Sequence, residues 1–202
     1  MISQADGPTN MRLDEELLVT GGLRVYTWDG PWVSLGRFQS PERDLLPGCT
    51  VPYVMRPTGG RAVLHGHDLT VSIGLIDAEL AGSRSVKRAY RRIIQPILDA
   101  FRAAGVDACL GEDVRAVSQN PRSTDCFAHV SANDVIERQT RRKICGCALR
   151  LTDVAVLAQC SIPLGPPLVN LASVFLAPAT IDPVQMSTER FIAGLKVETD
   201  RP

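Results

Sequence analysis

The sequence predicts an α+β domain with a mixed, mainly antiparallel sheet and flanking helices. Two observations carry this prediction. Short apolar runs that alternate like strands recur along the chain, whereas residues 10–20 and 85–104 space their apolar side chains as one face of a helix does. Because the two kinds of segment do not alternate strictly, the pattern disfavours a parallel β-α-β sheet. The 202 residues suffice for one domain, 1–202, with a full core.

Three segments are predicted as helices. The first covers 10–20, with Asn10 as its candidate N-cap. The second covers 85–104 and carries a continuous apolar stripe, although Pro96 should kink or split it. A short third helix is expected over 186–196. The helices at 10–20 and 85–104 should cover the sheet.

The remaining apolar runs are short enough to be strands. They cover 23–28, 32–35, 53–55, 62–64, 69–75, 106–110, 134–137, 144–151 and 154–162. A glycine pair, Gly59-Gly60, separates two of them. This strand–loop–strand unit differs from the strand–loop–helix of a P-loop or a dinucleotide-binding turn.

Composition excludes several classes of function. Lys plus Arg and Asp plus Glu both number 22, so no basic excess favours nucleic-acid binding. No run of about 18 apolar residues could span a membrane, and residues 1–12 lack the apolar segment of a signal peptide. We therefore expect a cytoplasmic protein with reduced thiols.

The chemistry-bearing side chains do not predict a metal centre. The six cysteines include no Cys-x-x-Cys pair, which argues against a zinc ribbon. His65 and His67 share one face of a strand and could hold a metal, but no carboxylate cluster completes such a site. The expectation is therefore that no metal is bound.

The segment Arg56-Pro-Thr-Gly-Gly-Arg-Ala-Val-Leu-His65 is the most informative in the chain. Gly59 and Gly60 lack a Cβ, so a ligand can approach the main chain closely. Arg56 and Arg61 place positive charge on either side of this turn. The loop suits a carboxylate, a phosphate or a thin acyl chain. Taken alone, its histidine reads more simply as a core or surface side chain with one hydrogen bond.

In their order and spacing, the motifs of this chain resemble those of the lipoate–protein ligase A family, within the wider biotin/lipoate ligase and octanoyltransferase group. The glycine-loop motif is followed about 80 residues later by a lysine, Lys143. The Gly-Arg-Gly-x-x-Gly-Arg loop expected of a biotin ligase is absent. The matching segments are Asn10–Glu15, Leu23–Asp29, Val33–Gln39, Arg56–His65, Asp68–Ser72, Cys126-Phe127, Asn133-Asp134 and Arg142–Ala148.

The resemblance implies a biotin/lipoate ligase-like catalytic fold and an acyl-transfer activity. Members of the family place an octanoyl or lipoyl group on a lysine of a carrier, here a lipoyl domain or a glycine cleavage H-type protein. Lys143 would stabilise developing oxyanion charge. An apolar tunnel around Val63, Val71 and Ile73 would hold the acyl tail. The implied substrate-binding residues are Arg56, Thr58, Gly59, Gly60, Arg61, Ala62, His65, Asn133, Gly146 and Ala148.

Two mechanisms within the family remain open. A transferase would take the acyl group from acyl carrier protein onto Cys126 as a thioester, with its thiol pKa lowered by Lys143 and Arg142. A ligase would instead use ATP and Mg and pass through an acyl-adenylate. The Cys126-Phe127 pair and the short chain favour the transferase, which needs no permanently bound cofactor. Cys145 and Cys147, where the family has small residues, are alternative thiols. A non-catalytic acyl-binding member is the third hypothesis.

Overall fold

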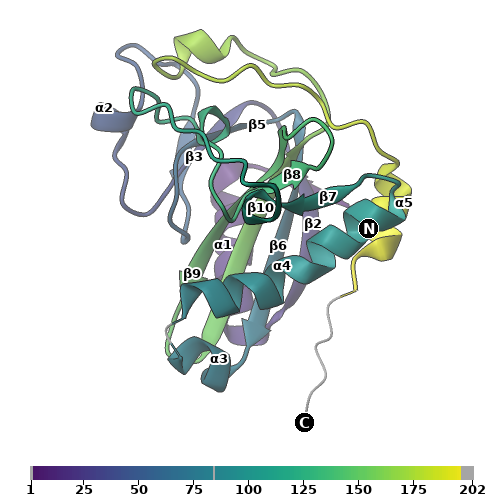
Figure 1. The fold of residues 1–202 in the computed structure, drawn as a ribbon. Helices are drawn as coiled ribbons and strands as arrows, with labels where there is room; N and C mark the ends of the chain where they lie inside the picture. Colours follow the sequence, from purple (N-terminus) through teal and green to yellow (C-terminus); the bar gives the residue numbers. More distant parts are fainter. Residues whose placement is uncertain (1, 84, 197–202) are drawn as a thin grey trace.

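The computed structural model describes residues 2–83 and 85–196 (Figure 1). A seven-stranded sheet with the strand order β1-β2-β6-β10-β9-β8-β7 forms its centre. All its neighbouring strands pair antiparallel except β1 with β2, so the predicted mixed, mainly antiparallel sheet is confirmed. The strands are β1 (Ser3–Ala5), β2 (Gly22–Trp28), β6 (Asp68–Ile76), β7 (Ala108–Leu110), β8 (Val135–Glu137), β9 (Lys143–Leu151) and β10 (Ala155–Pro163).

A second, three-stranded sheet lies beyond one end of the large sheet (Figure 1). It consists of β3 (Trp32–Leu35), β4 (Tyr53–Met55) and β5 (Val63–His65). The central strand β3 runs parallel to β4 and antiparallel to β5. Because β4 and β5 flank residues 56–62, this sheet positions the glycine loop against the large sheet.

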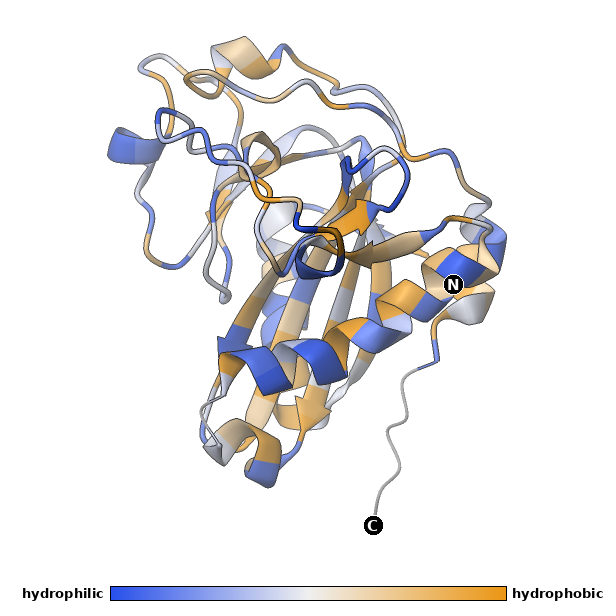
Figure 2. Ribbon diagram, in the orientation of Figure 1, coloured by the Kyte–Doolittle hydropathy of each residue, from blue (hydrophilic) through white to orange (hydrophobic). Residues whose placement is uncertain are grey.

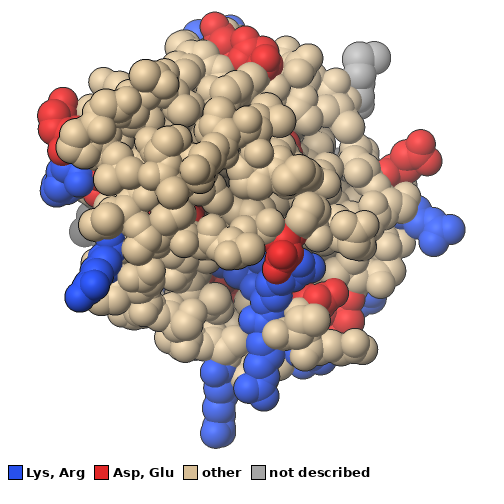
Figure 3. Space-filling view, turned by 90° about the horizontal axis from the view of Figure 1, so that it is seen from above, with Lys and Arg blue, Asp and Glu red and all other residues tan. Residues whose placement is uncertain are grey.

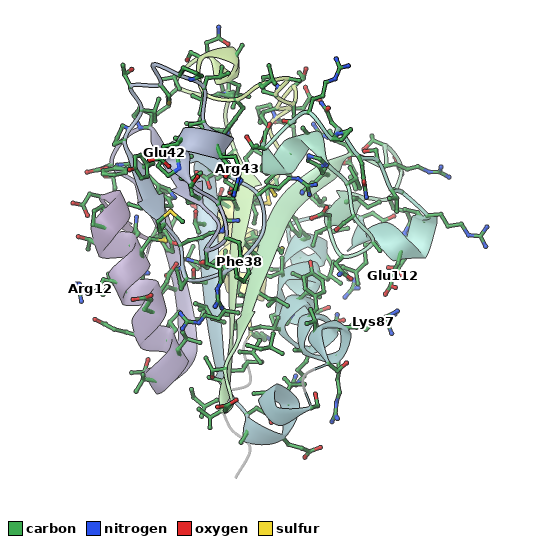
Figure 4. All side chains as sticks on the ribbon, turned by 90° about the vertical axis from the view of Figure 1, so that its left-hand side faces the viewer. Arg12, Phe38, Glu42, Arg43, Lys87 and Glu112 are labelled. Atoms are coloured by element: carbon green, nitrogen blue, oxygen red, sulfur yellow. The ribbon has the colours of Figure 1, made fainter. Side chains whose placement is uncertain are left out.

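Helices cover both faces of the large sheet. Helix α1 packs on β6 and β10 from one side, and α4 packs on β10 from the other, with α5 against α4 (Figures 1 and 4). None of the described helices has the length and apolar composition needed to cross a bilayer. The helices are α1 (Gly7–Thr20), α2 (Pro41–Asp44), α3 (Ala78–Gly82), α4 (Val86–Ala103) and α5 (Thr188–Gly194), with 3₁₀ turns η1 (Gly111–Val114), η2 (Cys126–Ala128) and η3 (Leu171–Ser173).

Helix α4 has the strongest amphipathic pattern in the chain (Figure 2). Its apolar stripe enters the main core, while its charged side chains face outward. The helix continues through Pro96, so the expectation that this residue might split it is wrong. Ile93, Ile94 and Ile97 are fully buried around the proline, and their packing offsets a cost of about 3 kcal/mol for a proline inside a helix.

Helix α1 begins three residues before the predicted start. The Asp6 side chain, not that of Asn10, caps it by accepting a 2.9 Å hydrogen bond from the Thr9 amide. Pro8 fits the first turn because the amide it lacks has no partner there. Asn10 is buried inside the helix, where its side-chain amide donates to the Ala5 carbonyl at 3.0 Å. Asn10 thereby ties the helix to β1.

Two other predicted elements are shorter than expected. The strand predicted from residue 106 begins at Ala108 because the Val106 amide instead bonds to the Phe101 carbonyl at the end of α4. The last helix spans Thr188–Gly194 within the predicted 186–196. Ser187 starts it by accepting a 3.3 Å hydrogen bond from the Arg190 amide.

Asp14 is a fully buried carboxylate that joins α1 to three strands. It accepts hydrogen bonds from Tyr26 (2.6 Å), Ser72 (2.7 Å) and Gln159 (2.6 Å), and it forms an ion pair with Arg24. Burial raises the pKa of Asp14, and the four partners oppose that shift. The network therefore holds its charge only through well-placed donors.

Asp14→Ala should lower the free energy of unfolding by about 3–5 kcal/mol, because it leaves Arg24 and three buried donors without their acceptor. Glu15→Ala is the matched control, since Glu15 is the exposed neighbour on the same helix. Urea titration of both variants measures the effect. Equal losses in the two variants would contradict the role given to this network.

Candidate functional site

A narrow, mainly apolar pocket lies where the small sheet meets strands β6, β10 and β9. It brings together six of the residues predicted for the site: Arg56, Gly60, His65, Cys126, Gly146 and Ala148. The rest of its lining comes from Met11, Tyr26, Trp28, Ser34, Val63, Thr70, Cys147, Gln159, Cys160 and Ser161. An apolar pocket with a few convergent polar groups is the form expected of a small-ligand site.

Arg56 organises the glycine loop. Its guanidinium donates to the Gly59 carbonyl at 2.6 and 3.1 Å and to the Arg61 carbonyl at 2.7 Å. It also donates to the Ser34 carbonyl at 2.8 Å and the Ser34 hydroxyl at 3.2 Å. These contacts occupy the five N–H donors of an arginine side chain. Burial lowers the pKa of Arg56 to about 10, so the group stays charged at neutral pH.

The glycine pair is held tightly against neighbouring backbone. Gly60 has a φ of +85°, a conformation that favours glycine. A Cβ added to Gly36 would lie 2.1 Å from the Gly60 carbonyl oxygen, so the two chain segments touch. Thr58 anchors the loop to the large sheet through a 2.6 Å hydrogen bond from its hydroxyl to Gln159. The loop therefore reaches the pocket in a fixed conformation.

His65 is a buried histidine with partners on both ring nitrogens. Its Nδ1 lies 2.8 Å from Asp68 and its Nε2 lies 2.8 Å from the Ser34 hydroxyl. The ring also stacks on Trp28, with centroids 4.0 Å apart. Because the Ser34 hydroxyl already accepts from Arg56, its own proton points to Nε2. This arrangement assigns the Nδ1–H tautomer to a neutral His65.

Asp68 is the anchor of this chain of hydrogen bonds. Its carboxylate accepts from Thr70 at 3.1 Å and from Ser161 at 2.6 Å, in addition to its contact with His65. Burial raises the pKa of Asp68, but His65 and Ser161 outweigh it and bring the pKa to about 2. Asp68 therefore keeps its charge in the folded state far below neutral pH.

This depressed pKa predicts a loss of stability in acid. The unfolded chain protonates Asp68 near its ordinary pKa of 3.8, whereas the folded chain holds the carboxylate down to about 2. The stabilisation is therefore complete above the ordinary pKa and is lost as pH falls towards 2. Urea unfolding from pH 6 to 2 should show a decline about 2–3 kcal/mol larger in wild type than in Asp68→Asn. The exposed Asp153→Asn should retain the wild-type decline, and parallel curves for all three would contradict the assignment.

Cys126 lies beside the glycine loop at the start of η2. Its amide donates to the Ala62 carbonyl at 2.8 Å, and the Ala62 amide donates to the Thr124 carbonyl at 3.0 Å. Asp125 caps the turn by accepting a 3.0 Å hydrogen bond from the Phe127 amide. These backbone contacts bring a thiol from a distant segment to the pocket wall. Ala62 thus positions the nucleophile candidate through its main chain.

Lys143 is buried at the start of β9, directly behind Cys126. Its Nζ lies 3.3 Å from Cys126 Sγ and 2.9 Å from the Cys126 carbonyl oxygen. It also donates to the His129 carbonyl at 3.2 Å and pairs with Asp134 at 3.0 Å. Three N–H donors therefore serve four acceptors. Burial lowers the pKa of Lys143, but Cys126 and Asp134 outweigh it, so the net pKa lies above the ordinary value.

The expected lowering of the Cys126 pKa is wrong for this state of the protein. Burial raises the pKa of the thiol above its ordinary value; Lys143 and Arg56 lower it, and Asp134 and Asp125 raise it further. The expectation rested on the neighbouring cations alone. Neither the burial of Cys126 nor the carboxylate of Asp134 is visible in the sequence pattern. Burial and the two carboxylates therefore outweigh the cations and favour the thiol form of Cys126.

Gly146 leaves the space in which the thiol and the lysine meet. A Cβ at this position would lie 3.2 Å from Cys126 Sγ and 3.6 Å from Lys143 Cε. Two residues further along the strand, Ala148 borders the loop, since its Cβ lies 3.6 Å from one built on Gly60. Small residues at these two positions keep the pocket open.

Several predicted residues lie outside the described lining of this pocket, among them Thr58, Gly59, Ala62 and Lys143. Lys143 instead lines a separate pocket on the other side of Cys126, together with Phe127. Arg61 is exposed and contributes its carbonyl to Arg56. Asn133 lies in the turn before β8, where its neighbour Asp134 makes the contact with Lys143. Val63 lines the pocket as expected. Two other residues expected there, Val71 and Ile73, instead enter the core under α4.

The alternative thiols Cys145 and Cys147 face the main core, together with Cys160 of the neighbouring strand. Cys147 and Cys160 also border the pocket. Burial raises the pKa of Cys145 and Cys147 well above the ordinary value. Neither makes a contact with Lys143 like that of Cys126. Among the described thiols, Cys126 therefore has the geometry of a nucleophile.

Sequence reasoning missed the carboxylate partners of the site. Asp134 stands in the Asn133-Asp134 motif, and Asp68 opens the segment after the glycine loop, but neither received a role. Ser34 and Gln159, which connect the loop to His65 and Asp14, lie on distant strands. Ser34 stands in the family-like segment Val33–Gln39, but the resemblance assigned it no role. A polar residue within an apolar strand is otherwise a weak signal, because many solvent-facing positions share it.

The chain is similar to proteins of known family. Residues 6–197 match the family model of the lipoyl protein ligase A/B catalytic domain. The chain belongs to this family. Among curated relatives it is 37% identical over 154 residues to the octanoyltransferase LipM of Anoxybacillus flavithermus, covering 69% of this chain and 55% of the relative. It is 35% identical over 184 residues to the LipM of Bacillus cereus, and this match covers 84% of this chain and 66% of the relative. The chain thus spans less than two thirds of these relatives.

Solved structures support the fold. The bipartite lipoate protein ligase of Thermoplasma acidophilum, studied with its E2 lipoyl domain, superposes with a TM-score of 0.67 at 20% identity and covers 96% of this chain and 80% of its own. A lipoate-protein ligase A bound with ATP gives a TM-score of 0.70 at 21% identity, covering 96% and 83%. At these identities the likeness establishes the biotin/lipoate ligase-like catalytic fold.

Proposed function

We propose that this chain is the catalytic domain, residues 1–202, of an octanoyltransferase that acts through a thioester on Cys126. The observation that carries the proposal is the 3.3 Å contact between Cys126 Sγ and Lys143 Nζ. Cys126 lines the apolar pocket, and Lys143 lies behind it. The LipM relatives support the choice of octanoyl transfer. A lipoyl group is the alternative cargo.

The proposed reaction has two balanced steps. The sulfur of Cys126 attacks the thioester carbonyl of octanoyl-acyl carrier protein, and the carrier leaves as a thiol with the proton that Cys126 gave up. The ε-amine of a carrier-domain lysine then attacks the Cys126 thioester. An amide forms, the C–S bond breaks, and the proton lost from the amine restores the Cys126 thiol. The first exchange is nearly neutral in energy, and amide formation drives the second.

The protein would assist both steps by fixed electrostatics. Lys143 carries one more acceptor than it has N–H donors, so one N–H can turn to the oxyanion of a tetrahedral intermediate without unfolding the site. The apolar pocket would hold the octanoyl tail and exclude water. His65 and Arg56 would keep the glycine loop in place around that tail. No metal or permanently bound cofactor enters this mechanism.

The proposed partners are an acyl carrier protein as donor and a lipoyl domain or H-type protein as acceptor, in the reducing cytoplasm. Phe38 supports docking near the loop, since it is 74% exposed and its ring is the neighbour that a Cβ on Gly59 would meet. The Arg37 guanidinium lies over that ring at 4.8 Å, and Arg43 bonds to the Phe38 carbonyl (Figure 4). Figure 3 shows that the face of the molecule seen from above is mostly uncharged and carries side chains of both signs.

The experiment is intact-protein mass measurement with two sets of substrates. With octanoyl-acyl carrier protein, the chain should gain one octanoyl group that hydroxylamine removes, and a lipoyl domain should then take it up. With octanoate, ATP and Mg, no transfer is expected. Transfer that requires ATP would instead establish a ligase that uses an acyl-adenylate. Tight binding of the acyl group with no transfer from either donor would establish an accessory acyl-binding member.

A further inference from the structure

Three thiols meet on the core side of β9 and β10, outside the proposed reaction. Cys145 and Cys147 stand two residues apart on one strand, so both side chains share a face. Cys160 pairs with Cys147 across the strands. The Sγ atoms of Cys145 and Cys147 are 3.4 Å apart, and all three sulfur atoms lie within 4.8 Å of one another. The three sulfur atoms therefore form a compact cluster on one face of the sheet.

A fourth polar group belongs to the same cluster. Tyr90 of α4 is 4% exposed, and apart from the Cys147 thiol its hydroxyl has no hydrogen-bond partner among the described residues. It packs in the core cluster that contains Cys145, Cys147 and Cys160, close enough for all three thiols to act on it electrostatically. Of the three thiols, that of Cys147 also acts on the hydroxyl as a side-chain hydrogen-bond partner. Tyr90 therefore adds a polar group to the sulfur cluster.

We propose that Cys145, Cys147 and Cys160 form a binding site for one thiophilic divalent cation, which is zinc in the cell. The Tyr90 hydroxyl lies next to the position that the three sulfur ligands leave open. Tetrahedral zinc holds sulfur at about 2.3 Å, which places paired sulfur atoms about 3.8 Å apart. The observed separations, from 3.4 Å to at most 4.8 Å, bracket that value. Binding forms three Zn–S bonds, breaks three S–H bonds and releases three protons to solvent.

The donor set selects the kind of metal. The three ligands are all sulfur, which favours zinc or another soft ion over magnesium or calcium. Three thiolates around a divalent ion leave one net negative charge. The Tyr90 hydroxyl can donate a hydrogen bond to one of these thiolates. Cys147 and Cys160 border the acyl pocket as well, so the pocket gives an ion a route from solvent. Cys126 is not one of the three, so the proposed nucleophile does not bind the ion, although the site shares Cys147 and Cys160 with the acyl pocket.

The test uses cadmium as a spectroscopic probe for the zinc site. Titration of the reduced full chain should give a thiolate-to-cadmium charge-transfer band that saturates at one equivalent, and zinc should displace it. In Cys145→Ala and Cys160→Ala the band should weaken and the affinity fall at least about tenfold, since each removes one of three ligands. Cys109→Ala, which changes another buried thiol, and Cys126→Ser should bind as wild type does.

The wild-type chain alone provides a second readout if the core variants fail to fold. Zinc should protect Cys145, Cys147 and Cys160, and no other cysteine, from alkylation under partly denaturing conditions, and it should raise the thermal midpoint. The proposal is overturned if no charge-transfer band forms, if the band persists in both cluster variants, or if zinc protects Cys126 instead. None of these outcomes depends on acyl transfer.

Discussion

Cys126→Ala should abolish acyl transfer, with the rate falling at least about 10⁴-fold, as when an enzyme nucleophile is removed. The thioester cannot form without the sulfur, and the pocket alone only binds the tail. The fold should remain, because Cys126 is half-buried and its structural hydrogen bond is made by its main-chain amide. Intact mass after incubation with octanoyl-acyl carrier protein should show no adduct.

Matched thiol variants make this prediction specific. Cys147→Ala removes a thiol that also borders the pocket, and Cys49→Ala removes one outside the described pocket lining. Both should still form the adduct, and peptide mapping should place it on Cys126. An adduct that survives in Cys126→Ala and maps to Cys145 or Cys147 would mean that this chain has moved its nucleophile to β9.

The pKa of Cys126 adds a kinetic signature to the same variant series. Because burial raises the pKa of this thiol, its alkylation by iodoacetamide in the free protein should keep accelerating above the pH at which an ordinary thiol levels off. A levelling of alkylation below the ordinary thiol pKa would contradict the burial argument.

Local pattern predicted the elements of this fold because each one has its own signal. The apolar stripe of α4 and the alternation in β6 depend only on side chains within the segment. Boundaries were less accurate where a tertiary contact decided them. Asn10 resembled a helix cap in sequence, but its burial against Ala5 placed it inside α1.

Motif order likewise predicted which residues belong to the site. Their hydrogen bonds, ion pairs and pKa shifts depend on residues far away in the sequence. Arg56 and Lys143 were both expected near a ligand. The five hydrogen bonds of Arg56 cannot be derived from the spacing of motifs. The same holds for the ion pair between Lys143 and Asp134. The pairing of Cys147 with Cys160 across β9 and β10 is equally invisible in a search for Cys-x-x-Cys.

Lys143→Met should lower the transfer rate about 10²–10³-fold by removing the cation beside the thioester. It should also destabilise the fold by about 3–5 kcal/mol, because Asp134 is left buried and unpaired. The loss of stability follows from the burial of Lys143 behind Cys126.

A second substitution separates the two effects of Lys143. In Lys143→Met/Asp134→Asn the orphan charge is gone, so urea unfolding should recover most of the lost stability while transfer stays slow. Arg142→Met is the matched control, because it removes the adjacent cation, whose ion-pair distances to Glu137 and Asp182 are 3.8 Å. This variant should leave the single-turnover rate near wild type. If the double variant regains the rate along with the stability, Lys143 acts only by holding the turn at Cys126 in place. If it regains stability alone, the positive charge at the sulfur is what the reaction needs.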